Sequence, residues 1–352
     1  MKNTYACIMA GGSGERFWPL SRVATPKHLV PLLSERTLLE ETVARLEQAL
    51  PASHIFILTN AAQIEACRAV LPQLEARQFI AEPAKRDTGP ACALGTALAR
   101  NLDPESVVAF LPADALIKDT ATFAIQFREA AALAARDETI VTFGIRPAHP
   151  STRFGYLETA EPLPGSTPTC PFFRAERFVE KPDAAKAAEY LKKGCFLWNA
   201  GIFLWKTETF LREARRSQPE FARFIENFPK SGHDDYLVQE FPKLPKISVD
   251  YAIMEKAERV AVAEALFDWD DVGSWTAIPQ HLTADAHGNT TQGRVIIHDA
   301  QNNIAISKKR VIALCGVHDL IVVETDDAIL VCHRDAAEQI KHLHPNLPDD
   351  VR

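Results

Sequence analysis

The sequence predicts an α/β protein followed by a small β-rich domain. Short apolar runs typical of buried strands alternate with helical segments through the first 145 residues. Strand–helix units of this length are typical of a parallel sheet with helices on both faces. After about residue 286 the helical pattern stops, and short β-branched runs separated by turns take its place. We therefore expect a large domain over residues 1–285 and a small β-rich domain over residues 286–352.

The elements follow from apolar spacing and β-branched composition. Expected helices cover 36–50, 63–74, 90–102, 123–136 and 184–193, and expected strands cover 5–10, 55–59, 107–111, 139–145, 173–179 and 196–205. In the small domain, strands are expected at 294–298, 303–307, 310–315, 320–324 and 328–332, with a helix at 336–343. Parallel sheets bind ligands at the carboxyl ends of their strands. A site is therefore expected in the loops after Ala10, Leu111 and Ile145.

Composition argues against several classes of protein. Apolar residues make up 47% and charged residues 24% of the chain, as in ordinary globular proteins. The net charge of -7 argues against a general affinity for nucleic acid or for an anionic membrane. No apolar run could span a bilayer, and the first residues lack the long apolar region of a secretion signal. Seven cysteines without C-x-x-C spacing favour a reducing compartment, so we expect a cytoplasmic protein.

A glycine-rich loop directly follows the first expected strand. The loop consists of Gly11, Gly12, Ser13 and Gly14. Closely spaced glycines let the backbone approach a phosphate and point its N–H groups at the oxygens. Arg16 and Lys27 add a planar guanidinium and a point charge. The loop could instead be a tight surface turn with solvated cations. It is not a P-loop, and it differs from a dinucleotide fingerprint because Phe17 occupies the third glycine position.

The loop continues as Glu-Arg-Phe-Trp-Pro-Leu-Ser-Arg and then Pro-Lys. This segment resembles the signature of the sugar-nucleotide pyrophosphorylases, and its tryptophan is similar to that of the mannose-1-phosphate guanylyltransferase family. His28 departs from the family, which usually continues Pro-Lys-Gln-Phe-Leu. The resemblance runs along the whole chain. It implies a Rossmann-like nucleotidyltransferase domain with a mixed, mainly parallel sheet and a small β-helix-like C-terminal domain. It also implies a short form, without the phosphomannose isomerase domain of some relatives.

The segment 82–90 resembles the family motif E-P-x-x-R-N-T-A-P, which implies contacts with the nucleobase. Together with the glycine loop, the implied nucleotide-binding residues are Glu82, Asp87, Thr88 and Pro90. Asp87 stands where the family has asparagine, and Gly89 where it has alanine. A carboxylate at Glu82 or Asp87 can accept hydrogen bonds from the N1–H and amino group of guanine. Asp87 could instead pair with Arg86.

Two aspartates resemble the metal ligands of the family. Asp114 ends an apolar strand in a segment similar to L-P-[SA]-D-H, with Ala115 in place of the usual histidine. Asp271 lies in the segment 268–275, which resembles W-x-D-V-G-[ST]-W. Two carboxylates completed by substrate phosphates suit Mg²⁺, which keeps few protein ligands. Without the resemblance, Asp114 would be expected to cap a turn, and the acidic cluster to stabilise a helix N-terminus.

Further segments imply a sugar site. The segment 178–182 matches the motif F-V-E-K-P, and 198–203 resembles W-N-[SA]-G-I-F. By resemblance Lys181 binds the sugar phosphate, and the sugar itself contacts Gly155, Glu180, Asn199 and Asp250. Taken alone, Glu180 and Lys181 would be read as a solvated ion pair at a strand end.

The resemblance implies an enzyme that makes GDP-mannose and pyrophosphate from GTP and mannose 1-phosphate. A phosphate monoester is already anionic at neutral pH, so no general base is needed. Cationic catalytic residues, Arg16, Lys27 and Lys181, would offset the repulsion between the two substrates. Alternatives are a pyrophosphorylase for another sugar or nucleotide, or a sugar-nucleotide sensor without catalysis. The β-rich domain has exposed edges and could form a homodimer.

Overall fold

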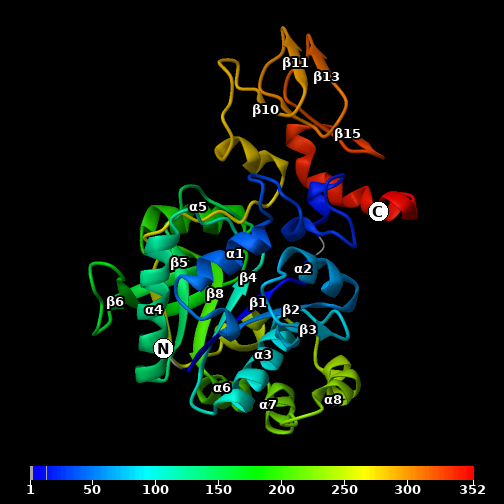
Figure 1. The fold of residues 1–352 in the computed structure, drawn as a ribbon. Helices are drawn as coiled ribbons and strands as arrows, with labels where there is room; N and C mark the ends of the chain where they lie inside the picture. The colour runs from blue at the N-terminus through cyan, green and yellow to red at the C-terminus, as the bar shows by residue number, and fades with distance from the viewer. Residues whose placement is uncertain (1–2, 13) are drawn as a thin grey trace.

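The computed structural model describes residues 3–12 and 14–352. One large sheet forms the centre of the first domain, with helices on both of its faces, and the C-terminal strands form a separate lobe at one end (Figure 1). The expected α/β fold class, with a β-helix-like C-terminal domain, is confirmed. None of the described helices is both long and apolar enough to cross a bilayer.

The large sheet is mixed, with most strands pointing one way. Its order, among the described residues, is β3-β2-β1-β4-β8-β5-β9-β7-β6. The strands are β1 (Thr4–Met9), β2 (Ile55–Asn60), β3 (Phe79–Glu82), β4 (Val107–Pro112), β5 (Ile140–Ile145), β6 (Tyr156–Pro162), β7 (Phe172–Val179), β8 (Phe196–Lys206) and β9 (Val260–Glu264). Ladders that include β7 or β8 are antiparallel, and the other ladders are parallel. Seven of these nine strands therefore share one direction.

Four of the eight described α-helices begin at a capping side chain. The eight are α1 (Leu38–Glu47), α2 (Ile64–Val70), α3 (Thr88–Leu102), α4 (Thr120–Asp137), α5 (Ala184–Lys193), α6 (Thr207–Ser217), α7 (Pro219–Glu226) and α8 (His233–Glu240). The four that are capped in this way are α1, α3, α4 and α5. At α1, Thr37 Oγ1 accepts from the Glu40 N–H, and the Glu40 carboxylate accepts from the Thr37 N–H. This capping box satisfies two donors that no helical carbonyl can reach. The sequence analysis did not foresee β3, β6, β9 or the helices α6, α7 and α8.

Two apolar cores sandwich the sheet because strand side chains alternate between its faces. On β1, Ala6 and Ile8 face one side, where α1 and α4 pack, while Cys7 faces the other side. On that second side α3 packs against α6 and α7, with Trp205 fully buried between them and the sheet. Burial on both faces fixes the strands firmly, so the loops at their carboxyl ends have a rigid base.

The C-terminal lobe stacks short strands, most of them parallel. They are β10 (Thr290–Gln292), β11 (Val295–His298), β12 (Ile304–Ser307), β13 (Ile312–Cys315), β14 (Leu320–Glu324) and β15 (Ile329–His333). β10, β12 and β14 form one parallel ladder and β11 pairs parallel with β13, as in successive turns of a β-helix. β15 closes the first ladder in antiparallel fashion. The helix expected at 336–343 is a 3-10 helix, Arg334–His342.

Candidate active site

Three neighbouring cavities lie at the carboxyl ends of the strands. A cavity of about 320 Å³ lies beside the glycine loop and the loop after β3, and one of about 210 Å³ lies over β8. Met9 and Thr88 line both of them. The third cavity, of about 390 Å³, lies between the glycine loop and the C-terminal domain. Arg153 connects the second cavity to the third. It lines the second cavity and donates a hydrogen bond to Asp271, which lines the third.

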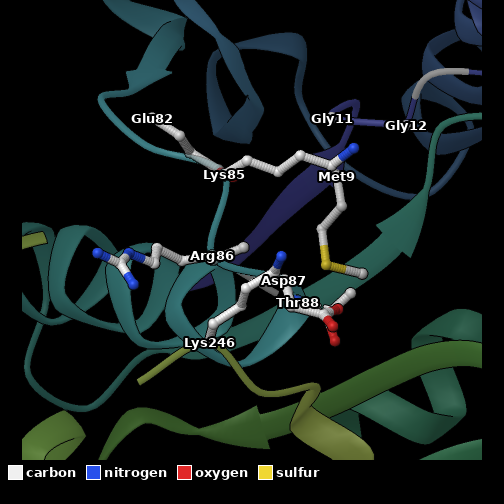
Figure 2. Close-up of a pocket in the computed structure, with 10 residues that line it drawn as sticks. Met9, Gly11, Gly12, Glu82, Lys85, Arg86, Asp87, Thr88 and Lys246 are labelled. Atoms are coloured by element: carbon white, nitrogen blue, oxygen red, sulfur yellow. Dashed lines mark hydrogen bonds between the residues drawn. The ribbon is translucent and has the colours of Figure 1, made fainter. Parts of the chain in front are cut away.

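The first cavity brings the glycine loop and the 82–90 loop together (Figure 2). Gly11 and Gly12 have open space where a side chain would be, so their backbone is accessible to a ligand. The side chain of Lys85 extends toward Gly11 (Figure 2). Burial raises the pKa of Glu82 to about 7, since no cation compensates the loss of water. Ser13 lies outside the described residues.

Asp87 caps α3. Its Oδ1 accepts from the Thr88 N–H at 2.8 Å, and its backbone has a φ of 72°. With a ψ of -179° this backbone lies outside the left-handed helical region, in a conformation that residues other than glycine rarely adopt, so Asp87 is strained. Within the described part of the chain Asp87 forms no ion pair with Arg86, so that alternative is not observed. Asp87 and Thr88 line the first cavity, whereas Pro90 is buried in α3 and lines none of the three.

Gly89 lets the Ile247 carbonyl lie closer to the start of α3 than alanine would allow. Its N–H donates to the Ile247 carbonyl at 3.0 Å. A Cβ at this position would lie 2.5 Å from that oxygen and 2.9 Å from the ring of Phe221. The segment before Asp250 therefore packs directly on the start of α3. Lys246 reaches the first cavity from this segment, a contribution that sequence reasoning missed.

The second cavity contains the four residues expected at the sugar. Asn199 is held by Thr142, whose Oγ1 donates to its Oδ1 at 3.0 Å, and its Nδ2 donates to Asp250 Oδ1 at 3.1 Å. The ladder between β5 and β8 shifts register here, and such a bulge re-aims side chains. Burial, with the nearby Glu180 carboxylate, raises the pKa of Asp250 to about 7. A Cβ on Gly155 would lie 2.6 Å from Glu180 Oε2.

Lys181 does not line this cavity itself but follows Glu180, which does. Its Nζ is 2.6 Å from Glu180 Oε1, and its backbone φ is 44°. Burial lowers the pKa of Lys181, but the ion pair with Glu180 outweighs it and holds the pKa above its usual value. Left-handed backbone in a non-glycine residue is uncommon and clusters at functional sites.

The third cavity holds Lys27 between the two candidate metal ligands. Lys27 Nζ lies 2.9 Å from Asp114 Oδ2 and 2.7 Å from the backbone oxygen of Asp271. Burial raises the pKa of Asp114, but Lys27 outweighs it and the pKa falls below its usual value. Gly14 has a φ of 63°, and a Cβ there would lie 2.6 Å from Lys27 Cβ. Only glycine therefore lets Lys27 pass under the loop.

The three aspartates around residue 270 have different roles. Asp268 accepts from the N–H groups of Lys118 and Asp119, at 2.9 and 2.7 Å. Asp270 accepts from the Val272 N–H at 2.7 Å, and its Oδ2 lies 2.8 Å from Nε2 of His281. Two of the three aspartates thus fix loops, in place of the helix N-terminus that was the alternative.

Asp271 alone of the three lines the cavity. It follows directly from Asp270 and precedes Val272, a β-branched residue with a φ of 43°. Such a conformation is strained and persists only where surrounding contacts fix it. Burial raises the pKa of Asp271, although Arg153 and Lys27 oppose this. The local strain and the bonds of Asp270 together aim Asp271 into the cavity.

Sequence reasoning missed Arg153. Its Nη2 lies 2.7 Å from Asp271 Oδ2, and its guanidinium passes so close to Gly273 that a Cβ there would lie 1.4 Å from it. Its Nη1 lies 3.3 Å from Glu338 in the C-terminal domain, which also lies 2.6 Å from Arg16 Nε. The only sequence signal was its place two residues before Gly155, which was expected to contact the sugar.

The donor set fits a hard cation. Asp114 and Asp271 line the same cavity and offer two carboxylates, the ligand type that Mg²⁺ prefers. Each carboxylate is paired with a cation, Lys27 or Arg153. The described residues contain no cluster of three or more histidine, cysteine, aspartate or glutamate side chains that could hold a metal by themselves. Substrate oxygens would therefore have to complete the coordination.

A model of the nucleotidyl transferase family matches residues 5–287. This chain belongs to that family. A model of the MannoseP isomerase/GMP-like beta-helix domain matches residues 293–347. The family resemblance expected from the glycine loop and the later motifs is thereby confirmed. Within this nucleotidyl transferase, all three cavities lie wholly or mostly in the part matched by the first model.

Other proteins of this family are similar over nearly all of the chain. Xanthan biosynthesis protein XanB of Xanthomonas campestris pv. campestris (strain B100) is 36% identical, over 97% of this chain and 73% of that protein. Mannose-1-phosphate guanylyltransferase of Escherichia coli (strain K12) is 34% identical, over 99% of this chain and 74% of that protein. The crystal structure of mannose-1-phosphate "geranyltransferase" from Thermus thermophilus superposes with a TM-score of 0.88 and 34% identity, covering 98% of this chain and 99% of that one.

Proposed function

We propose that this nucleotidyl transferase is a mannose-1-phosphate guanylyltransferase. It joins GTP to mannose 1-phosphate and forms GDP-mannose and pyrophosphate. The observation that carries the proposal is the continuous row of three cavities along one edge of the sheet. One offers a partly buried carboxylate, the next offers hydroxyl-binding side chains, and the third gathers cations and two aspartates. The names of relatives such as the Escherichia coli protein support this choice of substrates.

GTP would occupy the first and third cavities. A carboxylate at Glu82 accepts hydrogen bonds from the N1–H and amino group of guanine, which adenine cannot donate in that arrangement. Nucleotide-binding roles extend to Asp87 and Thr88, and to the glycine loop, Gly11, Gly12, Ser13 and Gly14, whereas Pro90 is buried in α3 and lines none of the three cavities. The loop N–H groups face the phosphates, and Arg16 and Lys27 bind their charge.

The sugar would occupy the second cavity. Glu180, Asn199 and Asp250 offer the acceptors and donors that sugar hydroxyls need, while Gly155 lets the backbone come close. Lys181, which is paired with Glu180, binds the phosphate of mannose 1-phosphate. Because Asn199 is held on two sides, the sugar is oriented without reorganisation of its partner.

The reaction requires charge compensation and alignment. An oxygen of the sugar phosphate attacks the α-phosphorus in line, a new P–O bond forms, and the bond to the β-phosphate breaks with its electrons on pyrophosphate. The attacking oxygen is already ionised, because the second pKa of a phosphate monoester is about 6. Lys181 holds the attacking phosphate, and Lys27 and Arg16 stabilise the leaving group. Mg²⁺ held by Asp114 and Asp271 would supply further neutralisation of phosphate charge.

Three further proposals concern the whole molecule. We place the enzyme in the cytoplasm, which its seven free cysteines support. We place the domain boundary at residues 285 and 286, ahead of β10, where limited proteolysis should cut first. We also propose a homodimer through the C-terminal domain, whose outer strands expose Ile296, Ile329 and Val331. Light scattering measures that assembly directly.

A pyrophosphate-release assay tests the function. GTP, UTP, dTTP and ATP are each combined with mannose 1-phosphate, glucose 1-phosphate and other sugar 1-phosphates, with Mg²⁺ present. We expect the highest kcat/KM for GTP with mannose 1-phosphate, and its loss in Lys181→Ala. A different preferred pair would assign another pyrophosphorylase. Ligand binding without pyrophosphate release would instead identify a sensor.

A further inference from the structure

The C-terminal domain reaches into the third cavity. Its 3-10 helix, Arg334–His342, buries Ala337 and Ile340 in one apolar cluster with Phe17 and Trp18, which follow the glycine loop. The indole N–H of Trp18 also donates to the Val351 carbonyl at 2.8 Å. The helix is therefore fixed against the phosphate side of the site, and its polar residues have a defined position there.

Lys341 differs from the other cations that line this cavity. Arg16 is paired with Glu338 at 2.6 Å, and Lys27 with Asp114 at 2.9 Å. Lys341 lines the same cavity, but in the part of the chain that the structure describes it has no carboxylate within 4.0 Å. A cation without an internal partner is free to bind an external anion, because no ion pair has to be broken first.

Glu338, one turn earlier, is itself an anion held at this place. Arg16 lies 2.6 Å from one of its oxygens and Arg153 lies 3.3 Å from the other. Two guanidinium groups from distant segments thus converge on a single carboxylate. The three side chains are 37–46% exposed, and ion pairs at such exposure contribute little. A polyphosphate, with more charge and more acceptor oxygens, can therefore replace Glu338.

We propose that the C-terminal domain completes the polyphosphate site of the enzyme. Lys341 contacts the triphosphate of the nucleotide or free pyrophosphate, and Glu338 holds Arg16 and Arg153 in position until the polyphosphate replaces it. The inference rests on the proposed function for the identity of the nucleotide, but its ligand class, a polyphosphate, can be tested by itself.

Pyrophosphate binding to the full chain, measured by calorimetry with Mg²⁺ present, tests this directly. Lys341→Gln should weaken binding about tenfold, the usual worth of one charge-assisted contact, and Lys341→Arg should restore most of it. Glu338→Gln should strengthen binding about two- to fivefold, because it removes a weak competitor. Lys309→Gln is the matched control, since Lys309 is an exposed lysine of the same domain that pairs with Asp326. It should leave binding unchanged.

The inference would be overturned if Lys341→Gln bound pyrophosphate as well as wild type does. Weaker binding in Glu338→Gln, or a wild-type protein that binds no pyrophosphate, would also overturn it. In the reaction, Lys341→Gln should raise the KM for GTP and leave the KM for mannose 1-phosphate unchanged. An equal rise in both would indicate a loosened domain and would also overturn it. If pyrophosphate binding depends on Lys341 but no guanylyl transfer occurs, the inference stands and the proposed function fails.

Discussion

Lys27 and Asp114, which are 87 positions apart in the chain, meet at 2.9 Å inside the phosphate-side cavity. The lysine side chain is only 6% exposed, and its ammonium also donates to the Asp271 backbone oxygen. A buried charge is tolerated only when it is paired in this way. One lysine therefore holds the glycine loop, β4 and the 271 loop in a common arrangement.

Replacing Lys27 by methionine should lower kcat by about 10²- to 10³-fold, as expected when a preorganised donor to a reacting oxyanion is removed. The measurement is single-turnover pyrophosphate release with saturating substrates. Lys192→Met, at an exposed position on α5, is the control and should retain full activity. A Lys27→Met enzyme with normal turnover would show that this lysine only supports the fold.

Asp271 and Asp268 provide a matched pair of variants that tests Mg²⁺ binding. Chelation by EDTA should stop the reaction, and added Mg²⁺ should restore it. Asp271→Asn should raise the Mg²⁺ concentration that gives half-maximal activity by at least about 10- to 100-fold. Mutating a residue that only supports a metal ligand already lowers metal affinity by about this factor. Asp268→Asn should lower the melting temperature, because a neutral amide oxygen accepts the two backbone N–H groups more weakly than a carboxylate does, but should leave the Mg²⁺ dependence unchanged. Equal Mg²⁺ dependence in both variants would exclude Asp271 as a ligand.

Glu82 should make nucleotide recognition depend on pH. Its pKa is raised to about 7, and only the ionised form accepts both guanine hydrogen bonds. The KM for GTP should therefore fall as pH rises from 6 to 8. Glu82→Gln should raise that KM about 10- to 100-fold and remove its pH dependence. Glu65→Gln, an exposed control, should behave like wild type. A KM for GTP that is independent of pH in wild type would contradict this role.

Asp250 should make stability depend on pH in the opposite sense to an ordinary aspartate. Its folded pKa of about 7 lies above the usual 3.8, so the folded state holds the proton more tightly. Below pH 4 both states are protonated, and as pH rises from about 4 to 7 stability is lost. Asp250→Asn should reduce this loss in urea unfolding at pH 4.5 and 8, whereas Asp234→Asn, at an exposed position, should not. An identical loss in Asp250→Asn would refute the assignment.

Gly89→Ala, a change toward the family motif, should destabilise this chain. The new methyl would lie 2.5 Å from the Ile247 carbonyl oxygen, a backbone atom that cannot move freely. Overpacking of this kind reduces the free energy of unfolding by about 1–3 kcal/mol. Urea unfolding measures the difference, with Gly11→Ala as the control because its Cβ would meet open space. Unchanged stability would mean that the 244–249 segment shifts to accommodate the methyl.

Most of the strand–helix order was predictable from sequence because apolar periodicity is local. The runs around Ile57, Phe110 and Phe143 are each buried on both faces and read as continuous apolar segments. β9 was not foreseen, because Val260–Glu264 has only five residues, two of them alanine, and it takes its place in the sheet only by pairing with β5 and β7. The amphipathic helices α6 and α7 were missed although their apolar spacing was available in the sequence.

The residues of the site also fall into a group that the sequence revealed and a group that only the structure revealed. The sequence singled out the glycine loop by its spacing, and the carboxylates at strand ends and the sugar-side motifs by resemblance to family motifs, because the residues of each follow one another within short segments. Only the tertiary structure decided that Arg153 holds Asp271, that Asp268 and Asp270 fix loops, and that the C-terminal helix reaches the phosphate side. Most of these contacts join residues more than 100 positions apart, and the aim of Asp271 depends on backbone strain at Val272. Spacing along the chain does not reveal such contacts, because they form only when the whole domain packs.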